Sequence, residues 1–120
     1  MKLYESAEDY LETILVLTER NGSVRAIDIS KDMDFTKASV SVAMHKLEDN
    51  GYIVISKGGK IILTEQGYDI AKSVYERHVI LTDAFIKLGV SPEQARIDAC
   101  KIEHDLSKET FEAIKKALKK

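Results

Sequence analysis

The part of the chain that most constrains its fold runs from residue 25 to residue 63, where two short helices precede a glycine-centred hairpin. Apolar residues recur at helical spacing over 25–33 and again over 37–50, and Gly51 follows the second stretch. Thr36 stands where its hydroxyl can cap the second helix. Two short helices joined by three or four residues are typical of a helix-turn-helix, although an αα-hairpin with a polar outer face would give the same pattern.

A predicted β-hairpin follows directly. The β-rich runs 52–56 and 60–63 are separated by Lys57-Gly58-Gly59, and the two glycines can supply the positive φ that a tight turn requires. A helix-turn-helix followed by a hairpin is a winged helix, and this order is more specific than any of its parts. The sequence therefore predicts a winged-helix DNA-binding module.

Small and hydrogen-bonding residues open the second helix, and lysines lie at the hairpin tip. Such side chains suit close approach to phosphates and base edges, although lysines at a hairpin tip are also common for solubility alone. Because the net charge is −2, any contact with nucleic acid must come from a local patch. The predicted DNA-contacting residues are Arg25, Thr36, Lys37, Ala38, Ser39, Ser41, Lys57 and Lys60.

Helices are also predicted on both sides of this module. Residues 5–20 form the first, with Ser6 as its cap and Asn21-Gly22 at its end. Thr64 caps a long helix over about 65–88. One face of that helix is apolar apart from a histidine, through Tyr68, Ala71, Val74, Tyr75, His78, Leu81, Phe85 and Leu88.

Two more helix starts follow. The motif Ser91-Pro92-Glu93-Gln94, a cap, a proline and a glutamine that closes a capping box, begins a helix to about Asp105, and Ser107 caps a last helix. The predicted fold is therefore mainly α. A winged helix-turn-helix with a two-stranded wing occupies 1–64, and an all-helical domain occupies 65–120.

Composition and charge further narrow the classes of protein to which the chain could belong. The 120 residues are 44% hydrophobic and 32% charged, which is ordinary for a small soluble globular protein. No apolar run approaches membrane-spanning length and no signal pattern begins the chain, so a cytoplasmic location without membrane contact is expected. One cysteine cannot form an intrachain disulfide, which fits a reducing compartment. A homodimer would help so short a chain to bury apolar surface.

A second feature is the run Cys100-Lys101-Ile102-Glu103-His104. On a helix its thiol, carboxylate and imidazole share one face, as in a transition-metal half-site, although a polar face can carry them by accident. Asp9 and Glu12, taken alone, are more simply part of a capping box and a solvated charge. His78 lies in an apolar stripe, where a histidine is more often a core or interface residue than a ligand.

Several short motifs spread along the chain belong together. They are Glu8-Asp9-Tyr10-Leu11-Glu12-Thr13-Ile14, Ala38-Ser39-Val40-Ser41, Lys46-Leu47-Glu48, Leu63-Thr64-Glu65-Gln66-Gly67, Arg77-His78 and Cys100-Lys101-Ile102-Glu103-His104. Through these motifs the chain resembles, over nearly all of its length, the metal-dependent repressors of the diphtheria toxin repressor and manganese transport regulator family. The resemblance implies a homodimer, with a winged helix in 1–64 and an all-helical metal-binding and dimerisation domain in 65–120. It also implies that divalent metal switches the dimer onto double-stranded operator DNA, repressing metal-uptake genes.

The resemblance also implies the metal ligands, which fall at Asp9, Glu12, His78, Cys100, Glu103 and His104. The carboxylate pair of the first helix matches the manganese branch of the family, whereas the cysteine matches the iron branch. The ancillary metal site of the iron branch would need ligands at Thr82 and Arg96, and neither residue can serve. Fe²⁺ and Mn²⁺ prefer about six oxygen and nitrogen ligands, and one thiolate favours Fe²⁺ over Mn²⁺, with Zn²⁺, Co²⁺ or Ni²⁺ as substitutes.

Two other functions are compatible with parts of the sequence. A metal-independent winged-helix regulator would respond to an organic ligand or to none. A small metalloenzyme could use His78, His104 and a carboxylate, but six donors leave little room for a substrate, and no nucleophile–base pair or phosphate loop is present. The sequence therefore favours a regulator over an enzyme.

Overall fold

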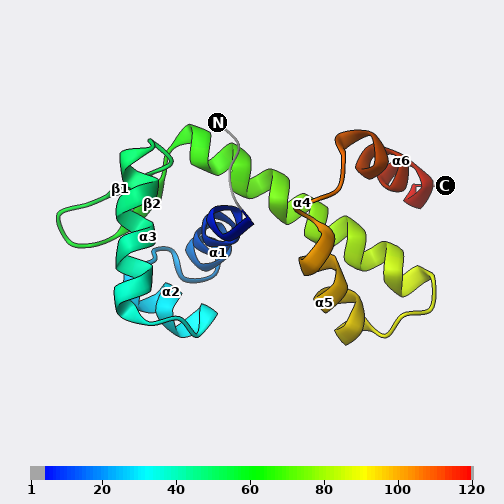
Figure 1. The fold of residues 1–120 in the computed structure, drawn as a ribbon, viewed down its shortest axis with the longest axis horizontal. Helices are drawn as coiled ribbons and strands as arrows, with labels where there is room; N and C mark the ends of the chain where they lie inside the picture. The colour runs from blue at the N-terminus through cyan, green and yellow to red at the C-terminus, as the bar shows by residue number, and fades with distance from the viewer. Residues whose placement is uncertain (1–4, 120) are drawn as a thin grey trace. The chain divides into compact units, whose positions relative to one another are not determined.

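The computed structural model describes residues 5–119, which form two compact units that divide between residues 72 and 73 (Figure 1). The first four residues of the predicted 1–64 domain lie outside the described residues. The order of elements confirms a mainly helical fold with one two-stranded wing. They are α1 (Glu5–Asn21), α2 (Ala26–Met33), α3 (Lys37–Asp49), β1 (Ile53–Ile55), β2 (Ile61–Leu63), α4 (Glu65–Lys87), α5 (Pro92–Ile102) and α6 (Lys108–Leu118).

The first unit is the winged helix. A tight turn joins α2 to α3, where Asp34 adopts a left-handed conformation with φ 56° and the Ser30 hydroxyl donates to the Phe35 carbonyl at 2.6 Å. The Thr36 hydroxyl then accepts a hydrogen bond from the Ser39 amide at 3.1 Å, which confirms the predicted cap of α3. Ser6 is not a cap, because α1 has already begun at Glu5.

The wing is an antiparallel pair in which Ile53 faces Leu63 and Ile55 faces Ile61. Of the two glycines at its tip, only Gly59 has a positive φ, at 85°. A further backbone bridge joins Lys60 to Arg25, next to a hydrogen bond from the Ile61 amide to the Val24 carbonyl. The wing is thereby tied to the start of α2.

The core of the first unit is built from the apolar stripes of its helices and the inner face of the wing. Its largest fully buried side chains lie on α1, α2, α3 and β1, at Leu11, Ile14, Ile29, Met44 and Ile53. Since successive strand residues face opposite ways, Val54 and Ile62 point outward and are about half exposed. This packing fixes the outer face of α3 relative to the wing.

The second unit contains the rest of α4 with α5 and α6. Ser91 and Ser107 cap α5 and α6 as predicted, each accepting from the amide three residues on. The Gln94 side chain does not close a capping box, because it donates forward to Asp98 at 2.9 Å. An ion pair of 2.8 Å between Lys115 and Glu76 ties α6 to α4.

The predicted apolar face of α4 is buried only in part. Ala71, Val74 and Leu81 are buried, whereas Tyr75 is 41% and Leu88 is 80% exposed. Leu88 follows the last residue of α4, which ends at Lys87. None of the helices in residues 5–119 is long and apolar enough to cross a membrane.

Candidate metal centre and nucleic-acid interface

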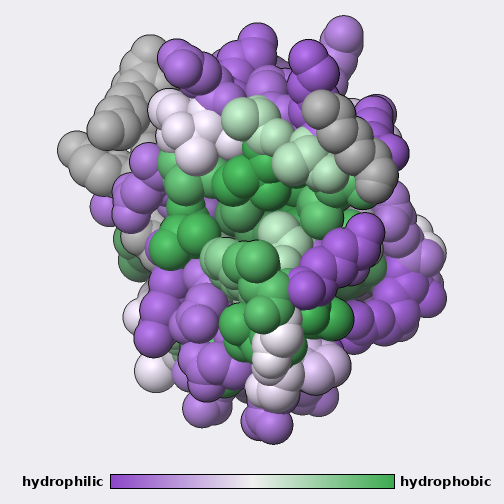
Figure 2. Space-filling view, turned by 90° about the vertical axis from the view of Figure 1, so that its right-hand side faces the viewer, coloured by the Kyte–Doolittle hydropathy of each residue, from purple (hydrophilic) through white to green (hydrophobic). Residues whose placement is uncertain are grey.

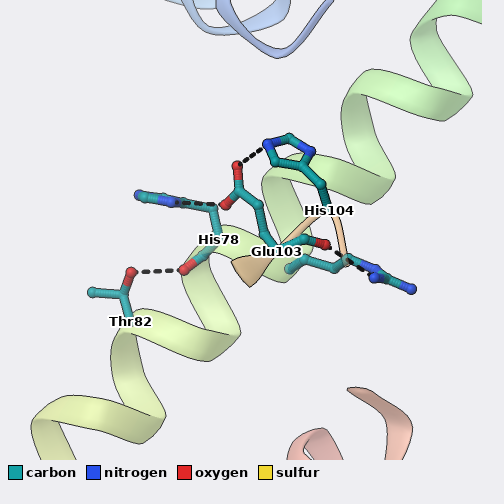
Figure 3. Close-up of polar contacts among 5 residues, drawn as sticks. His78, Thr82, Glu103 and His104 are labelled. Carbon is teal, nitrogen blue, oxygen red and sulfur yellow. Dashed lines mark hydrogen bonds and ion pairs between the residues drawn. The ribbon is translucent and has the colours of Figure 1, made fainter. Parts of the chain in front are cut away.

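A buried carboxylate lies between two imidazoles in the second unit (Figure 3). Nδ1 of His78 is 3.0 Å from Oε2 of Glu103, and Nε2 of His104 is 3.4 Å from Oε1. The Glu103 side chain is 0% exposed, that of His104 is 3% exposed and that of His78 is 26% exposed. A buried carboxylate requires compensating partners, and both of its oxygens here face nitrogens that can also ligate a metal.

Two segments far apart in sequence position these groups. His78 lies in α4, where its own carbonyl accepts a hydrogen bond from the Thr82 hydroxyl at 2.7 Å (Figure 3). Glu103 is the C-cap of α5 and keeps helical angles, with φ −59° and ψ −27°. His104 comes from the turn that leads to α6.

The prediction that α5 reaches Asp105 is wrong, because the helix ends at Ile102. The donors of the motif nevertheless stay together, since Glu103 continues the helical geometry for one more residue. The Cys100 sulfur, on an exposed residue, lies within 4.8 Å of a Glu103 carboxylate oxygen. The thiol, the carboxylate and the imidazole of the motif are therefore neighbours in the second unit.

Arg77 also contributes to this candidate site, although no role was predicted for it from the sequence. Its Nη1 donates to the Glu103 carbonyl at 3.0 Å and to the Leu106 carbonyl at 2.6 Å, and its guanidinium lies 5.2 Å from the centroid of the Phe111 ring. Two features of the sequence could have indicated this role. Arg77 is adjacent to His78, and the last carbonyls of a helix need hydrogen-bond donors from outside the helix.

The other two predicted ligands belong to the first unit. Asp9 and Glu12 are both half-buried on α1, and their separation of three residues puts them one turn apart on the same side of the helix. Tyr10 and Leu11 between them are buried in the core of that unit. Both carboxylates are thus held on a well-packed helix.

The eight residues predicted to contact DNA are all exposed in the first unit. Thr36 and Ser39 are joined by a hydroxyl–hydroxyl hydrogen bond of 2.9 Å at the start of α3. Arg25 and Lys60 are neighbours through their backbone bridge. Two cations therefore lie where the wing meets the helix-turn-helix.

Val42 was missed as a member of this surface. It is 56% exposed in the middle of α3, and Ala38, also exposed, lies one turn before it. The signal was available, because residues four apart in a helix share a face. The exposed face of α3 is thus partly apolar.

Two models of one family match almost the whole chain. The N-terminal DNA binding domain of the iron dependent repressors matches residues 2–60, and their metal binding and dimerisation domain matches residues 64–120. The transcriptional regulator MntR of Escherichia coli O157:H7 is 33% identical over 111 residues, 92% of this chain and 72% of that protein. The chain belongs to the iron-dependent repressor family. MntR of Listeria monocytogenes strain EGD-e, a member with a helix-turn-helix, is 34% identical over 91% of this chain and 77% of its own length.

Solved structures agree with this family assignment. The manganese regulator SloR has a TM-score of 0.83 at 26% identity, covering 99% of this chain and 55% of its own. IdeR of T. acidophilum, at 23% identity and a TM-score of 0.82, shares the fold over all of this chain and 56% of its own. The chain thus spans about half the length of these two structures.

Membership of this family confirms the expected class of function. The chain is a metal-responsive transcriptional regulator with a divalent metal cofactor, and its two parts match a DNA-binding domain and a dimerisation domain. The metal-independent regulator is therefore not favoured. An enzymatic function is likewise not supported, because the family and its members are transcriptional regulators.

Proposed function

We propose that this chain is a cytoplasmic repressor that, loaded with Fe²⁺ or Mn²⁺, binds operator DNA as a homodimer and represses metal-uptake genes. The observation that carries the proposal is the buried Glu103 carboxylate with an imidazole at each oxygen. Carboxylate and imidazole are the donors that first-row divalent ions take from proteins. Such a group in the domain that the family uses for metal binding is best explained as part of a metal site.

The proposed ligand set is wider than this carboxylate and its two histidines. Cys100 is supported by its place beside Glu103, and the two carboxylates of α1 are supported by the family resemblance. When bound, a divalent cation supplies the positive charge that several carboxylates can share. The six proposed ligands are Asp9, Glu12, His78, Cys100, Glu103 and His104.

The composition of this set favours Fe²⁺ over Mn²⁺. Five of the six residues offer oxygen or nitrogen, which suits both ions, while the Cys100 thiolate is a softer ligand that suits Fe²⁺ better. The same thiolate would let Zn²⁺, Co²⁺ or Ni²⁺ substitute.

Regulation follows from where the ligands originate. Asp9 and Glu12 belong to the DNA-binding unit, and the other four residues belong to the helical unit. If all six residues hold one ion, metal loading selects one arrangement of the two units. The fraction of molecules in that arrangement then rises according to how much more tightly it binds the metal than other arrangements do.

Homodimerisation is supported by apolar side chains on the surface of the second unit. Figure 2 shows a face on which hydrophobic residues gather into a continuous area. A soluble monomer rarely exposes a large contiguous apolar patch, so an interface is the simplest explanation. The exposed large hydrophobic residues of this unit are Tyr75, Val79, Ile86, Leu88 and Ile97.

In a dimer, two copies of α3 would enter successive major grooves about 34 Å apart, or a multiple of this distance. Ser39 and Ser41 offer hydroxyls to base edges and phosphates, and Lys37 offers charge to the backbone. Arg25, Lys57 and Lys60 would add phosphate contacts beside the helix, with Thr36 and Ala38 completing the surface.

The proposal is tested by measuring Mn²⁺ and Co²⁺ affinity, by calorimetry under reducing conditions, for the wild type and two variants. Glu103→Gln should lose at least about tenfold in affinity, because it removes an anionic ligand. Glu93→Gln, at an exposed acidic residue in the first turn of α5, serves as the control and should bind as the wild type does. Equal affinity for all three proteins would contradict the assignment of the metal centre to Glu103.

A further inference from the structure

We propose that Arg77 is a positioning residue for the metal centre, which holds the backbone of Glu103 so that its carboxylate stays beside His78. The inference rests on the proposed function, because it concerns how the same metal centre is assembled. It assigns a role to a residue that offers no metal-binding atom of its own.

Arg77 contacts the chain on both sides of His104. One guanidinium nitrogen donates to the Glu103 carbonyl at 3.0 Å and to the Leu106 carbonyl at 2.6 Å. These carbonyls follow the last residue of α5, where no further helical turn supplies amide donors. The guanidinium therefore fixes the turn that carries two of the proposed ligands.

Arg77 and His78 hold Glu103 at two points. The two residues are adjacent on α4, and Arg77 binds the main chain of Glu103 while His78 contacts its carboxylate at 3.0 Å. A glutamate held at both ends has little rotamer freedom left, so its ordering cost is met during folding and not during metal binding. Partners of this kind commonly change metal affinity by 10–100-fold.

The Phe111 ring extends this arrangement to α6. Phe111 is buried, and the Arg77 guanidinium lies 5.2 Å from its ring centroid. A planar guanidinium can stack on a ring while its edge donates to carbonyls, whereas a lysine ammonium is a point charge that cannot do both equally well. The chemistry therefore calls for arginine at this position.

The structure offers a matched control. The Lys115–Glu76 pair also ties a segment after α5 to α4, but it touches no residue of the metal centre. Lys115→Met would therefore loosen α6 on α4 and leave the Glu103 turn intact. Arg77→Met keeps an unbranched stem and removes every donor.

The experiment compares Mn²⁺ affinity and the visible absorption spectrum of the Co²⁺-loaded protein for the wild type, Arg77→Met, Arg77→Lys and Lys115→Met. We expect Arg77→Met to bind Mn²⁺ about 10–100-fold more weakly and to show a shifted Co²⁺ spectrum. Arg77→Lys should fall between it and the wild type, and Lys115→Met should match the wild type within about twofold.

Two results would overturn the inference. One is wild-type affinity and spectrum in Arg77→Met, or in Arg77→Lys if only that variant folds. The other is an equal loss in Lys115→Met, which would mean that any loosening of the second unit weakens metal binding. Failure of the proposed function has a different signature, since Glu103→Gln would then bind metal as tightly as the wild type.

Discussion

At the scale of single residues, Val42 shows that the face of α3 proposed to read DNA is partly apolar. An exposed valine beside Ala38, among hydroxyl and lysine side chains, suits contact with the methyl groups of thymines in a major groove. Its two γ-methyl groups together would be worth about 1–2 kcal/mol when buried against DNA.

An operator for this test is first selected from random DNA. Val42→Ala is expected to bind that operator roughly tenfold more weakly than the wild type does. Replacing the contacted thymine with deoxyuridine, which lacks the methyl group, should weaken the wild type similarly and the variant little further. Additive losses from the two changes would show that Val42 and the methyl group do not touch.

Within the proposed ligand set, Cys100 is the residue expected to decide the choice of metal, because it is the one sulfur ligand. Replacing its thiol by the harder carboxylate in Cys100→Glu should move the preference from Fe²⁺ and Co²⁺ towards Mn²⁺, on the order of tenfold in the affinity ratio. The ratio is measured by titrating each ion into the wild type and the variant at one pH under anaerobic conditions. An unchanged ratio would exclude the sulfur from the ligand set.

At the scale of elements, the joint between the wing and α4 depends on Gly67. A Cβ added there would overlap the Tyr52 carbonyl oxygen, which already accepts from the Thr64 amide at 3.0 Å. Gly67→Ala should therefore lower the free energy of unfolding by roughly 1–3 kcal/mol. Gly58→Ala is the control, because open space surrounds that glycine, and equal urea midpoints for both variants would contradict this account.

The link between α6 and α4 predicts a pH dependence. Glu76, chiefly through its hydrogen bond and then through its charge, raises the pKa of Lys115 above its usual 10.5. Because the pKa is higher in the folded state, the stabilisation is fully present below pH 10.5 and is lost as the pH rises through the folded value. The difference in Tm between the wild type and Glu76→Gln should therefore shrink above pH 10.5, and a constant difference would contradict the pair.

The elements also show what the sequence could predict. Thr36, Ser91 and Ser107 were identified as caps because a cap is a local feature, set by one hydroxyl and an amide three residues on. The end of α5 was misplaced because that end is stabilised by Arg77, 26 residues earlier in the chain. Periodicity predicted which face of α4 is apolar, but it could not show which of these residues the other helices cover, because burial depends on packing between elements.

The proposed ligands also differ in how far the sequence alone could predict their proximity. The spacing of Cys100, Glu103 and His104 was enough to propose a half-site, since one helical turn determines their proximity. Spacing alone could not bring His78 to the same carboxylate, because that contact depends on how α4 packs in the second unit. His78 was predicted as a ligand through the family resemblance. Its 3.0 Å contact with Glu103 gives a physical reason to group the two residues.

At the scale of the whole molecule, the chain combines a winged helix that carries exposed cationic and hydroxyl groups with a helical unit that holds a buried carboxylate between two imidazoles. Two models of one family match residues 2–60 and 64–120, and α4 is continuous across the division between the two units at residues 72 and 73. Metal bound at the proposed centre, whose ligands come from both units, is expected to control DNA binding by the winged helix.

The most direct test is the affinity of the full chain for its selected operator, measured by fluorescence anisotropy with and without Fe²⁺ or Mn²⁺ under reducing conditions. One fixed salt concentration is needed, because the phosphate contribution to binding changes steeply with salt. We predict that metal strengthens DNA binding by at least about fivefold, the lower end of a typical allosteric coupling. Equal affinity with and without metal would contradict metal control of DNA binding.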